Sequence, residues 1–169
     1  MILIAHRGNT TGPNHAMENN PEYVDAALKK GYHVEVDLFY DDTYGWRLGH
    51  DTPRYEIDWE WLVDDMRIDR LWIHCKNLWA LQELTYKRSV GPRGSYLNFF
   101  YHERDHATIT SNGYLWFYPG VHNEAGYQDK YNKRPAGIAV MPPKDMNLKY
   151  FAGVCTDDVE FYKSVDWNK

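Results

Sequence analysis

The sequence predicts an α/β fold, because short β-rich runs recur along the chain and capped helical segments separate the first of them. The length of 169 residues suits a single domain. Most of the runs have the length of a strand and end in polar residues. They are Ile2 to Ala5, His33 to Tyr40, Trp46 to Leu48, Leu71 to Cys75, Leu97 to Tyr101, Tyr114 to Tyr118, Ile138 to Met141 and Gly153 to Thr156.

The helical segments are marked by their caps. In the segment from Asn20 to Gly31, Asn20 is the predicted N-cap, Pro21 occupies the first helical position and Gly31 is the predicted C-cap. Two more segments follow a capping side chain in the same way: residues 59–66 after Asp58 and residues 78–86 after Asn77. Strands and helices in this order form parallel βαβ units, which wind into a doubly wound sheet or a closed barrel.

The second half of the chain has weaker helical signals. Beyond Lys87, Gly-Pro, Asn-Gly and Pro-Pro pairs separate the strand-like runs, which predicts strands joined mainly by loops. No internal repeat or Ser/Gly-rich linker interrupts the chain, so we expect one domain over residues 1–169.

Composition excludes several classes of function. With 19 basic and 24 acidic residues the net charge is −5, which lacks the Lys/Arg excess of a nucleic-acid-binding protein. No run approaches the roughly 18 apolar residues of a transmembrane segment, and residues 1–8 are typical of a strand and not of an export signal. We therefore expect a cytoplasmic protein without a transmembrane segment. Cys75 and Cys155 lie in apolar segments, which predicts buried free thiols.

Four clusters carry chemistry, and three of them fall at or just beyond strand ends, where α/β active sites form. They are His6-Arg7-Gly8, Glu18-Asn19, Glu35-Val36-Asp37 and Gly49-His50-Asp51. Side chains alternate along a strand, so Glu35 and Asp37 share one face while the apolar face packs on helices. Two carboxylates inside a fold cost several kcal/mol each unless a cation neutralises them, which favours a divalent metal. Oxygen ligands favour Mg²⁺ or Ca²⁺ over zinc.

Each cluster also has an ordinary structural interpretation. Glu35 and Asp37 could lie on an exposed edge strand, and His6 could be a core or surface histidine without a catalytic role. Arg7 and Glu18 could form an ion pair, and the His50-Asp51 pair could be a plain turn. The set taken in order favours the functional interpretation.

In this order the clusters resemble the motifs of the glycerophosphodiester phosphodiesterases, which are related in fold to phosphatidylinositol-specific phospholipases C and to spider-venom sphingomyelinase D. That family has His-Arg-Gly at the end of its first strand, then Glu-Asn-Thr, Glu-x-Asp and His-Asp. Its third strand carries Glu-x-Lys, for which this chain has His74-Cys75-Lys76, so that His74 replaces the glutamate. Residues 153–157 reproduce the Gly-(apolar)-x-Thr-Asp end of the last strand.

The resemblance implies a trimmed TIM-type (β/α) barrel with helices reduced in the second half and a site at the carboxyl ends of its strands. A full barrel takes about 250 residues, so loops must replace several helices here. We count seven barrel strands and leave the eighth unassigned.

The resemblance also implies roles for the clustered residues. His6 and His50 would be the acid/base pair, Arg7 and Lys76 would face the phosphate, and the metal would bind Glu35 and Asp37 with support from Glu18. His74 would either ligate the metal or only donate a hydrogen bond. As a ligand it would shift the preference toward Mn²⁺ or Zn²⁺.

Three functions remain open. The first is metal-dependent hydrolysis of glycerophosphodiesters or of a related small or lipid-derived phosphodiester. The second is a phospholipase D-like or sphingomyelinase D-like lyase that forms a cyclic phosphate. The third is a degenerate, non-catalytic binding barrel. The sequence predicts no oligomeric state.

Overall fold

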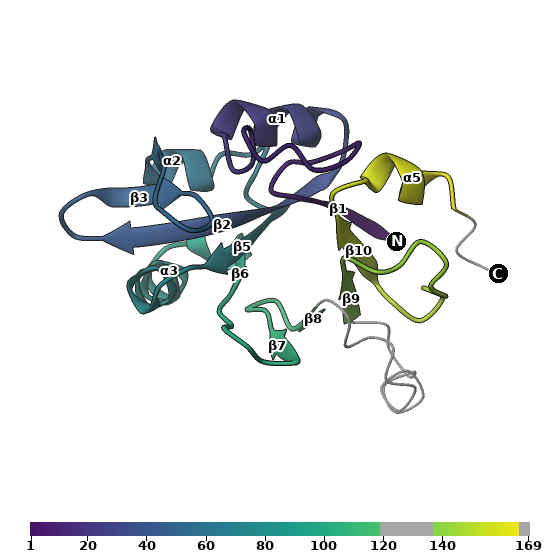
Figure 1. Cartoon of the computed structure of the whole chain (residues 1–169). Coiled ribbons are helices and arrows are strands. Elements are labelled where there is room, and N and C mark those ends of the chain that lie inside the picture. The colour runs from purple at the N-terminus through teal and green to yellow at the C-terminus, as the bar shows by residue number, and fades with distance from the viewer. Residues whose placement is uncertain (119–136, 166–169) are drawn as a thin grey trace.

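The computed structural model describes residues 1–118 and 137–165, and its centre is a curled, mostly parallel sheet (Figure 1). Seven described strands run parallel in the spatial order β6-β5-β2-β1-β10-β9-β8. Their bounds are β1 Ile2–His6, β2 His33–Asp41, β5 Leu71–Cys75, β6 Asn98–Phe100, β8 Leu115–Phe117, β9 Gly137–Val140 and β10 Gly153–Thr156. The first and last strands in the sequence, β1 and β10, are neighbours in the sheet.

Three short antiparallel strands extend this sheet. β3 (Gly45–Leu48) pairs with β2 and with β4 (Tyr55–Ile57), and β7 (Ala107–Ile109) pairs with β8. Sequence reasoning missed β4 and β7, because each has only three residues and lies in a hairpin outside the parallel core. It also treated Trp46 to Leu48 as one more strand of unspecified direction, which the structure shows to be antiparallel.

The described helices lie mainly in the first half. They are α1 (Pro21–Lys29), α2 (Trp59–Leu62), α3 (Leu78–Val90) and α5 (Val159–Lys163), with a 3-10 turn η1 at Gly94–Tyr96. Asn20, Asp58 and Asn77 accept backbone hydrogen bonds as N-caps, as predicted. The backbone of Gly31, just past the cap residue Lys30, has a φ of +92°, which suits glycine.

Two helix lengths were predicted wrongly. The predicted helix over residues 59–66 ends at Leu62, because the Asp64 side chain accepts a hydrogen bond from the Met66 amide and holds a turn instead. The predicted helix over residues 78–86 continues to Val90, where Gly91 ends it.

The described core residues form three clusters, of which the two largest lie on opposite faces of the sheet. On the convex face, Val34, Val36 and Leu38 pack with side chains of the helices, as predicted. On the concave face an aromatic and aliphatic cluster fills the interior: Ile4, Trp72, Phe100, Trp116, Ile138, Val140 and Cys155. The ring centroids of Phe100 on β6 and Trp116 on β8 are 4.6 Å apart. Because β6 and β8 lie at opposite ends of the order of parallel strands, this contact shows how strongly the sheet curls.

The predicted α/β class is therefore confirmed: the structure is a curled sheet with few helices. The two cysteines are free and buried, as predicted, and burial raises the pKa of both the Cys75 and the Cys155 thiol. Among the described residues, no helix has the length and apolar character needed to cross a membrane.

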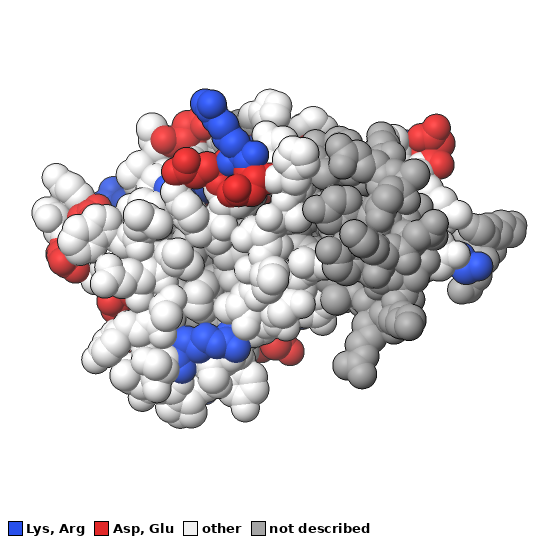
Figure 2. All heavy atoms as spheres, turned by 90° about the horizontal axis from the view of Figure 1, so that it is seen from below, with Lys and Arg blue, Asp and Glu red and all other residues white. Residues whose placement is uncertain are grey.

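The outer surface near α3 carries exposed apolar side chains, namely Leu78, Trp79, Tyr86 and Val90. Figure 2, which views the molecule from below the orientation of Figure 1, shows that the described part of this face is mostly uncharged, with a few acidic and basic side chains. The charged groups that matter for chemistry lie elsewhere, on the concave face of the sheet.

Candidate functional site

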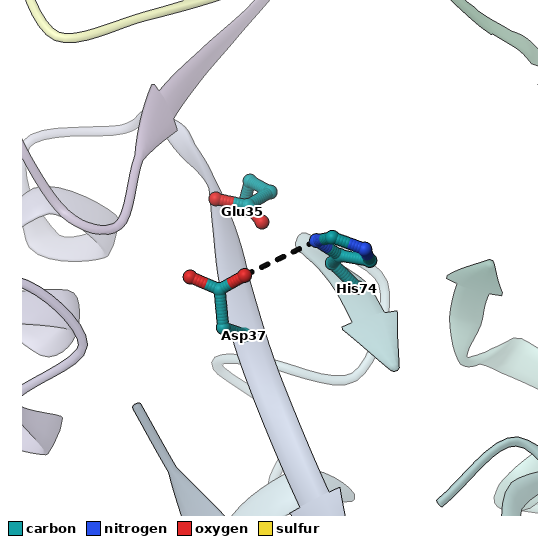
Figure 3. A group of neighbouring side chains, drawn as sticks. All are labelled: Glu35, Asp37 and His74. Atoms are coloured by element: carbon teal, nitrogen blue, oxygen red, sulfur yellow. Dashed lines mark hydrogen bonds and ion pairs between the residues drawn. The ribbon is translucent and has the colours of Figure 1, made fainter. Parts of the chain in front are cut away.

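Two acidic side chains and one histidine meet on the concave face. Glu35 and Asp37 project from β2, and His74 projects from the neighbouring β5, where it is in register with Asp37 (Figure 3). One potential ligand atom from each residue lies within 4.8 Å of the others. Glu35 is 3 % exposed and Asp37 is fully buried, so the alternative of an exposed edge strand is wrong.

Asp37 is surrounded by cationic and amide groups. Arg7 Nε lies 2.9 Å from Asp37 Oδ2, while His74 Nδ1 and Lys76 Nζ lie 3.1 Å and 3.5 Å from Oδ1. The Asn19 amide donates a hydrogen bond of 3.0 Å to Oδ2. Burial alone would raise the pKa of Asp37, but the hydrogen bond with His74 and the charges of Arg7 and Lys76 hold it well below its usual range. Asp37 is therefore an anion compensated by the chain itself.

Glu35 has fewer partners than Asp37. The backbone N–H of Arg7 donates a hydrogen bond of 3.3 Å to Glu35 Oε2, and His6 Nε2 lies 3.9 Å from the same oxygen. Burial and the nearby charge of Asp37 raise the pKa of Glu35. Glu35 is thus the carboxylate that gains most from an added cation.

The His74 ring is fixed by its neighbours on both sides. Nδ1 faces Asp37, and Nε2 lies 3.4 Å from the backbone carbonyl oxygen of His102. The rings of Phe100 and His102 stack on it, with centroids 5.2 Å and 4.5 Å away. The Asp37 carboxylate and the His102 carbonyl both only accept, so a neutral ring can donate to one of them and not to both. In the tautomer with the proton on Nε2, Nδ1 offers a lone pair beside Asp37 that can bind a metal ion in place of the proton.

His6, at the end of β1, is oriented by a carboxylate from the other end of the chain. Its Nδ1 lies 2.8 Å from Asp157 Oδ1, just beyond β10. Burial alone would lower the pKa of His6, but the hydrogen bond with Asp157 and the charge of Glu35 outweigh it, and the pKa is raised. The Asn9 amide donates to both Asp157 and Glu18, at 2.8 Å and 3.1 Å, and so ties this pair to the following loop.

The loop between β1 and α1 owes its shape to Arg7 and Asn19. Both have left-handed backbone conformations, with φ of +53° and +63°, and the Asn19 N–H donates to the Arg7 carbonyl at 3.1 Å. The Asn19 side chain accepts from the Asp37 N–H at 2.9 Å and donates to its carboxylate. Asparagine tolerates this conformation better than most residues, so one side chain can both turn the loop and hold Asp37.

The predicted ligand Glu18 lies apart from the group formed by Glu35, Asp37 and His74. Its carboxylate contacts Arg7 Nη1 at 3.0 Å, the Asn9 amide and His15 Nδ1. The ion pair between Arg7 and Glu18, which sequence reasoning left open, is therefore present. Glu18 holds the guanidinium that in turn contacts Asp37.

Two cavities open beside these residues and share Arg7 and His50. The inner cavity, of about 310 Å³, is lined by His6, Arg7, Glu35, His50, His74 and His102 and by Trp116, Tyr118, Val140 and Met141. The outer cavity, of about 290 Å³, is lined by polar residues of the β1–α1 loop and of residues 49–54. The predicted histidine pair therefore lines one cavity.

His50 lies at the mouth of the inner cavity, where its side chain is 42 % exposed and Nδ1 is 2.7 Å from Asp51 Oδ1. Burial lowers the pKa of His50, helped by the positive charges of Arg7 and Lys76 and opposed by Asp37 and Asp51. The pKa values of the two histidines thus move in opposite directions. This separation is how one site keeps one imidazole protonated and the other neutral.

Sequence reasoning assigned no role to Asp157 and gave little weight to His102. Asp157 directly follows β10 and His102 lies two residues beyond β6, at the same edge as His6, which was the available signal. His102 Nδ1 is buried and has no hydrogen-bond partner among the described residues. Burial, with the nearby His74 and Lys76, lowers the pKa of His102 to about 4, so its ring is neutral near pH 7.

Comparison with models of protein families, with curated protein sequences and with solved structures finds no match to this chain. Its function therefore has to be argued from the geometry of the site.

Proposed function

We propose that the chain is a divalent-cation-dependent phosphodiesterase on a trimmed TIM-type (β/α) barrel, acting on a glycerophosphodiester or a related small or lipid-derived phosphodiester. The observation that carries the proposal is the inner cavity, where His6, His50, Arg7 and Glu35 meet beside His74. His6, His74 and Met141 lie at or next to the carboxyl ends of parallel strands. Active sites of barrel enzymes lie at that end of the sheet.

The residues present fit a divalent cation. Glu35 and Asp37 offer oxygen atoms, and His74 offers Nδ1 with its Nε2 proton directed at a backbone carbonyl, as in many metal-bound histidines. A bound cation would neutralise charge on the non-bridging oxygens of the phosphoryl group. Arg7 and Lys76 already contact Asp37, and their charges weaken cation binding. We therefore expect modest affinity and, given the nitrogen ligand, a preference for Mn²⁺ or Zn²⁺ over Ca²⁺.

The two histidines supply the proton transfers. His50, whose pKa is lowered, is neutral near pH 7 and accepts the proton of the attacking oxygen. His6, whose pKa is raised by Asp157 against the effect of burial, holds a proton to give to the departing oxygen. Arg7, fixed by Glu18 and Asp37, lines the cavity between them and orients the anionic phosphate.

Hydrolysis of bis(p-nitrophenyl) phosphate tests the proposal. We expect release of p-nitrophenol that stops with EDTA and returns with Mn²⁺. His6→Ala and His50→Ala should each lower the rate by about 10²–10⁴-fold, the range of lost acid/base catalysis. His106→Ala, at an exposed histidine outside the cavity, is the matched control and should keep the rate. A rate that survives EDTA and both cavity variants would sink the proposal.

One observation favours a second candidate, a binding barrel without turnover. Arg7 and Lys76 already supply two cations beside Asp37, an arrangement that suits a barrel that holds a phosphate without catalysis. Tight binding of a phosphodiester with no product in a phosphorus NMR spectrum would favour this candidate. In the same spectrum a cyclic phosphate product would point to the lyase instead of hydrolysis.

A further inference from the structure

We propose that the substrate is a phosphodiester with two unlike arms, a flat unsaturated one and a short polyol. The flat arm lies in the inner cavity and the polyol in the outer one. This inference rests on the proposed function and adds to it the class of substrate.

The junction of the two cavities places the phosphate. Arg7 and His50 line both cavities, so an anionic group between them contacts the guanidinium and has one cavity on each side. A phosphodiester carries one substituent on each of two ester oxygens around a central anionic phosphorus. The shape of the site matches that layout.

The inner cavity favours a flat arm. The His102 ring lies nearly parallel to His74, at an interplanar angle of 3°, and Tyr118 meets His102 edge-on with centroids 6.0 Å apart. Trp116 and Met141 add apolar surface to the lining of the same cavity. Unsaturated rings stack on such surfaces whatever their substituents.

The inner cavity also offers a hydrogen bond that the described chain leaves unused. His102 Nδ1 is buried without a partner there, and the ring lines the cavity. Buried polar atoms normally have partners, so we infer that a ligand edge that reaches this ring supplies the hydrogen bond that the described residues do not make. A flat arm with a hydrogen-bonding edge, such as a heterocycle or a substituted phenol, fits this wall best.

The outer cavity favours a neutral, hydroxyl-rich arm. Its lining includes the hydrogen-bond acceptors Glu18 and Asp51 and the donors Arg54 and His15. The Thr52 hydroxyl, also in the lining, can both donate and accept. The two carboxylates disfavour a second anionic group, and this cavity has no Trp, Tyr or Phe in its lining, whereas the inner cavity has Trp116 and Tyr118. Hydroxyl groups both donate and accept, so a short polyol such as glycerol satisfies this lining.

Calorimetric titration with three phosphate monoesters in the presence of Mn²⁺ tests both arms without requiring turnover. We expect phenyl phosphate to bind roughly tenfold more tightly than methyl phosphate, the gain of one stacked ring. Glycerol 3-phosphate should also bind more tightly than methyl phosphate, by several-fold.

Two variants assign each gain to its cavity. Tyr118→Ala should abolish the advantage of phenyl phosphate and leave that of glycerol 3-phosphate, and Arg54→Gln should do the reverse. Both side chains are at the surface, so neither change threatens folding. Tyr96→Ala, at an exposed tyrosine of η1, is the control and should change none of the three affinities.

Equal affinity for the three monoesters, no binding of any of them, or equal losses in both variants would overturn the two-arm assignment. If one of these results is found and bis(p-nitrophenyl) phosphate is still hydrolysed, only the two-arm assignment is wrong and the phosphodiesterase proposal stands. If each variant loses only the affinity gain assigned to its own cavity and no diester is hydrolysed, the two-arm assignment stands and the phosphodiesterase proposal is wrong.

Discussion

The two walls of the inner cavity differ in almost every physical property. The wall formed by β1, β2 and β5 carries buried charges that hold one another in place, and α1 and α3 pack against the outer face of β2. The wall formed by β6, β8 and β9 carries rings and aliphatic groups, including Trp116 and Val140, with Phe100 packed behind them in the core. One curled sheet thus places a fixed charged surface opposite an apolar one.

The difference shows how such a small domain can build a site. Charges on the first wall interact more strongly because the second wall excludes water from between them. The apolar wall needs only shape and area, so it tolerates short strands and loops. The charged wall needs fixed positions, and these come from longer strands and capped helices. The predictions below test this contrast.

The largest effect is expected from Asp37→Asn. The change leaves Arg7, His74 and Lys76 without their shared anion, and breaking a buried charge cluster costs about 3–5 kcal/mol. We expect that loss in urea unfolding and no measurable phosphodiester hydrolysis. Glu56→Gln, which removes an exposed partner of Arg47, is the control and should change stability by less than about 0.5 kcal/mol. A loss below about 1 kcal/mol for Asp37→Asn would show that the cluster does not hold the charged wall together.

On the apolar wall, Phe100→Ala should lower stability by about 3–5 kcal/mol, because the ring is buried and packs on Trp116 and His74. Activity per folded molecule should fall by less than about tenfold, since no charged group is removed. Urea unfolding and initial rates measure the two quantities. If folded Phe100→Ala protein is as inactive as the Asp37→Asn variant, the proposed difference between the two walls is wrong.

Asn19 separates backbone shape from hydrogen bonding on the charged wall. Asn19→Ala loses the two hydrogen bonds to Asp37. Alanine also adopts a φ of +63° less readily than asparagine, so we expect the free energy of unfolding to fall by about 2–4 kcal/mol. Asn19→Gly loses the same bonds without the conformational cost and should be about 1 kcal/mol less destabilising. If the glycine variant is the less stable of the two in urea unfolding, the left-handed conformation contributes nothing to the cost.

The smallest effect is the pH dependence that comes from His6. Its pKa is raised in the folded protein, so its contribution to stability is fully present below about pH 6.5 and is lost as pH rises through the raised value. Asp157→Asn removes the partner that raises it. In EDTA, the stability difference between the wild type and this variant should therefore be larger near pH 6 than near pH 9. A difference that stays constant over this range would mean that Asp157 does not set the protonation of His6.

Much of the fold followed from local signals. The caps Asn20, Asp58 and Asn77 marked helix starts, and the alternation from Val34 to Leu38 placed the acidic pair on the inner face of β2. These features depend on neighbouring residues in the chain, so sequence patterns reveal them. Helix ends and three-residue edge strands depend on competing turns and tertiary pairing, which is why the end at Leu62 and the strands β4 and β7 were missed.

The site was predictable in its members but not in its contacts. The clusters contained His6, Arg7, Glu35, Asp37 and His50, and the resemblance added His74. The structure brings all six to one region. The contact of Asp157 with His6 joins residues that are 151 positions apart, and no local pattern encodes it. The same holds for the His102 carbonyl that orients His74, and for Glu18, which contacts Arg7 and lies outside the acidic group.

Anomalous diffraction from crystals grown with Mn²⁺ tests the central claim most directly. The account predicts one strong manganese peak within bonding distance of Glu35, Asp37 and His74 Nδ1, with His6 and His50 facing the same cavity. Fully occupied Mn²⁺ sites elsewhere on the protein, with no manganese peak between these three side chains, would contradict it.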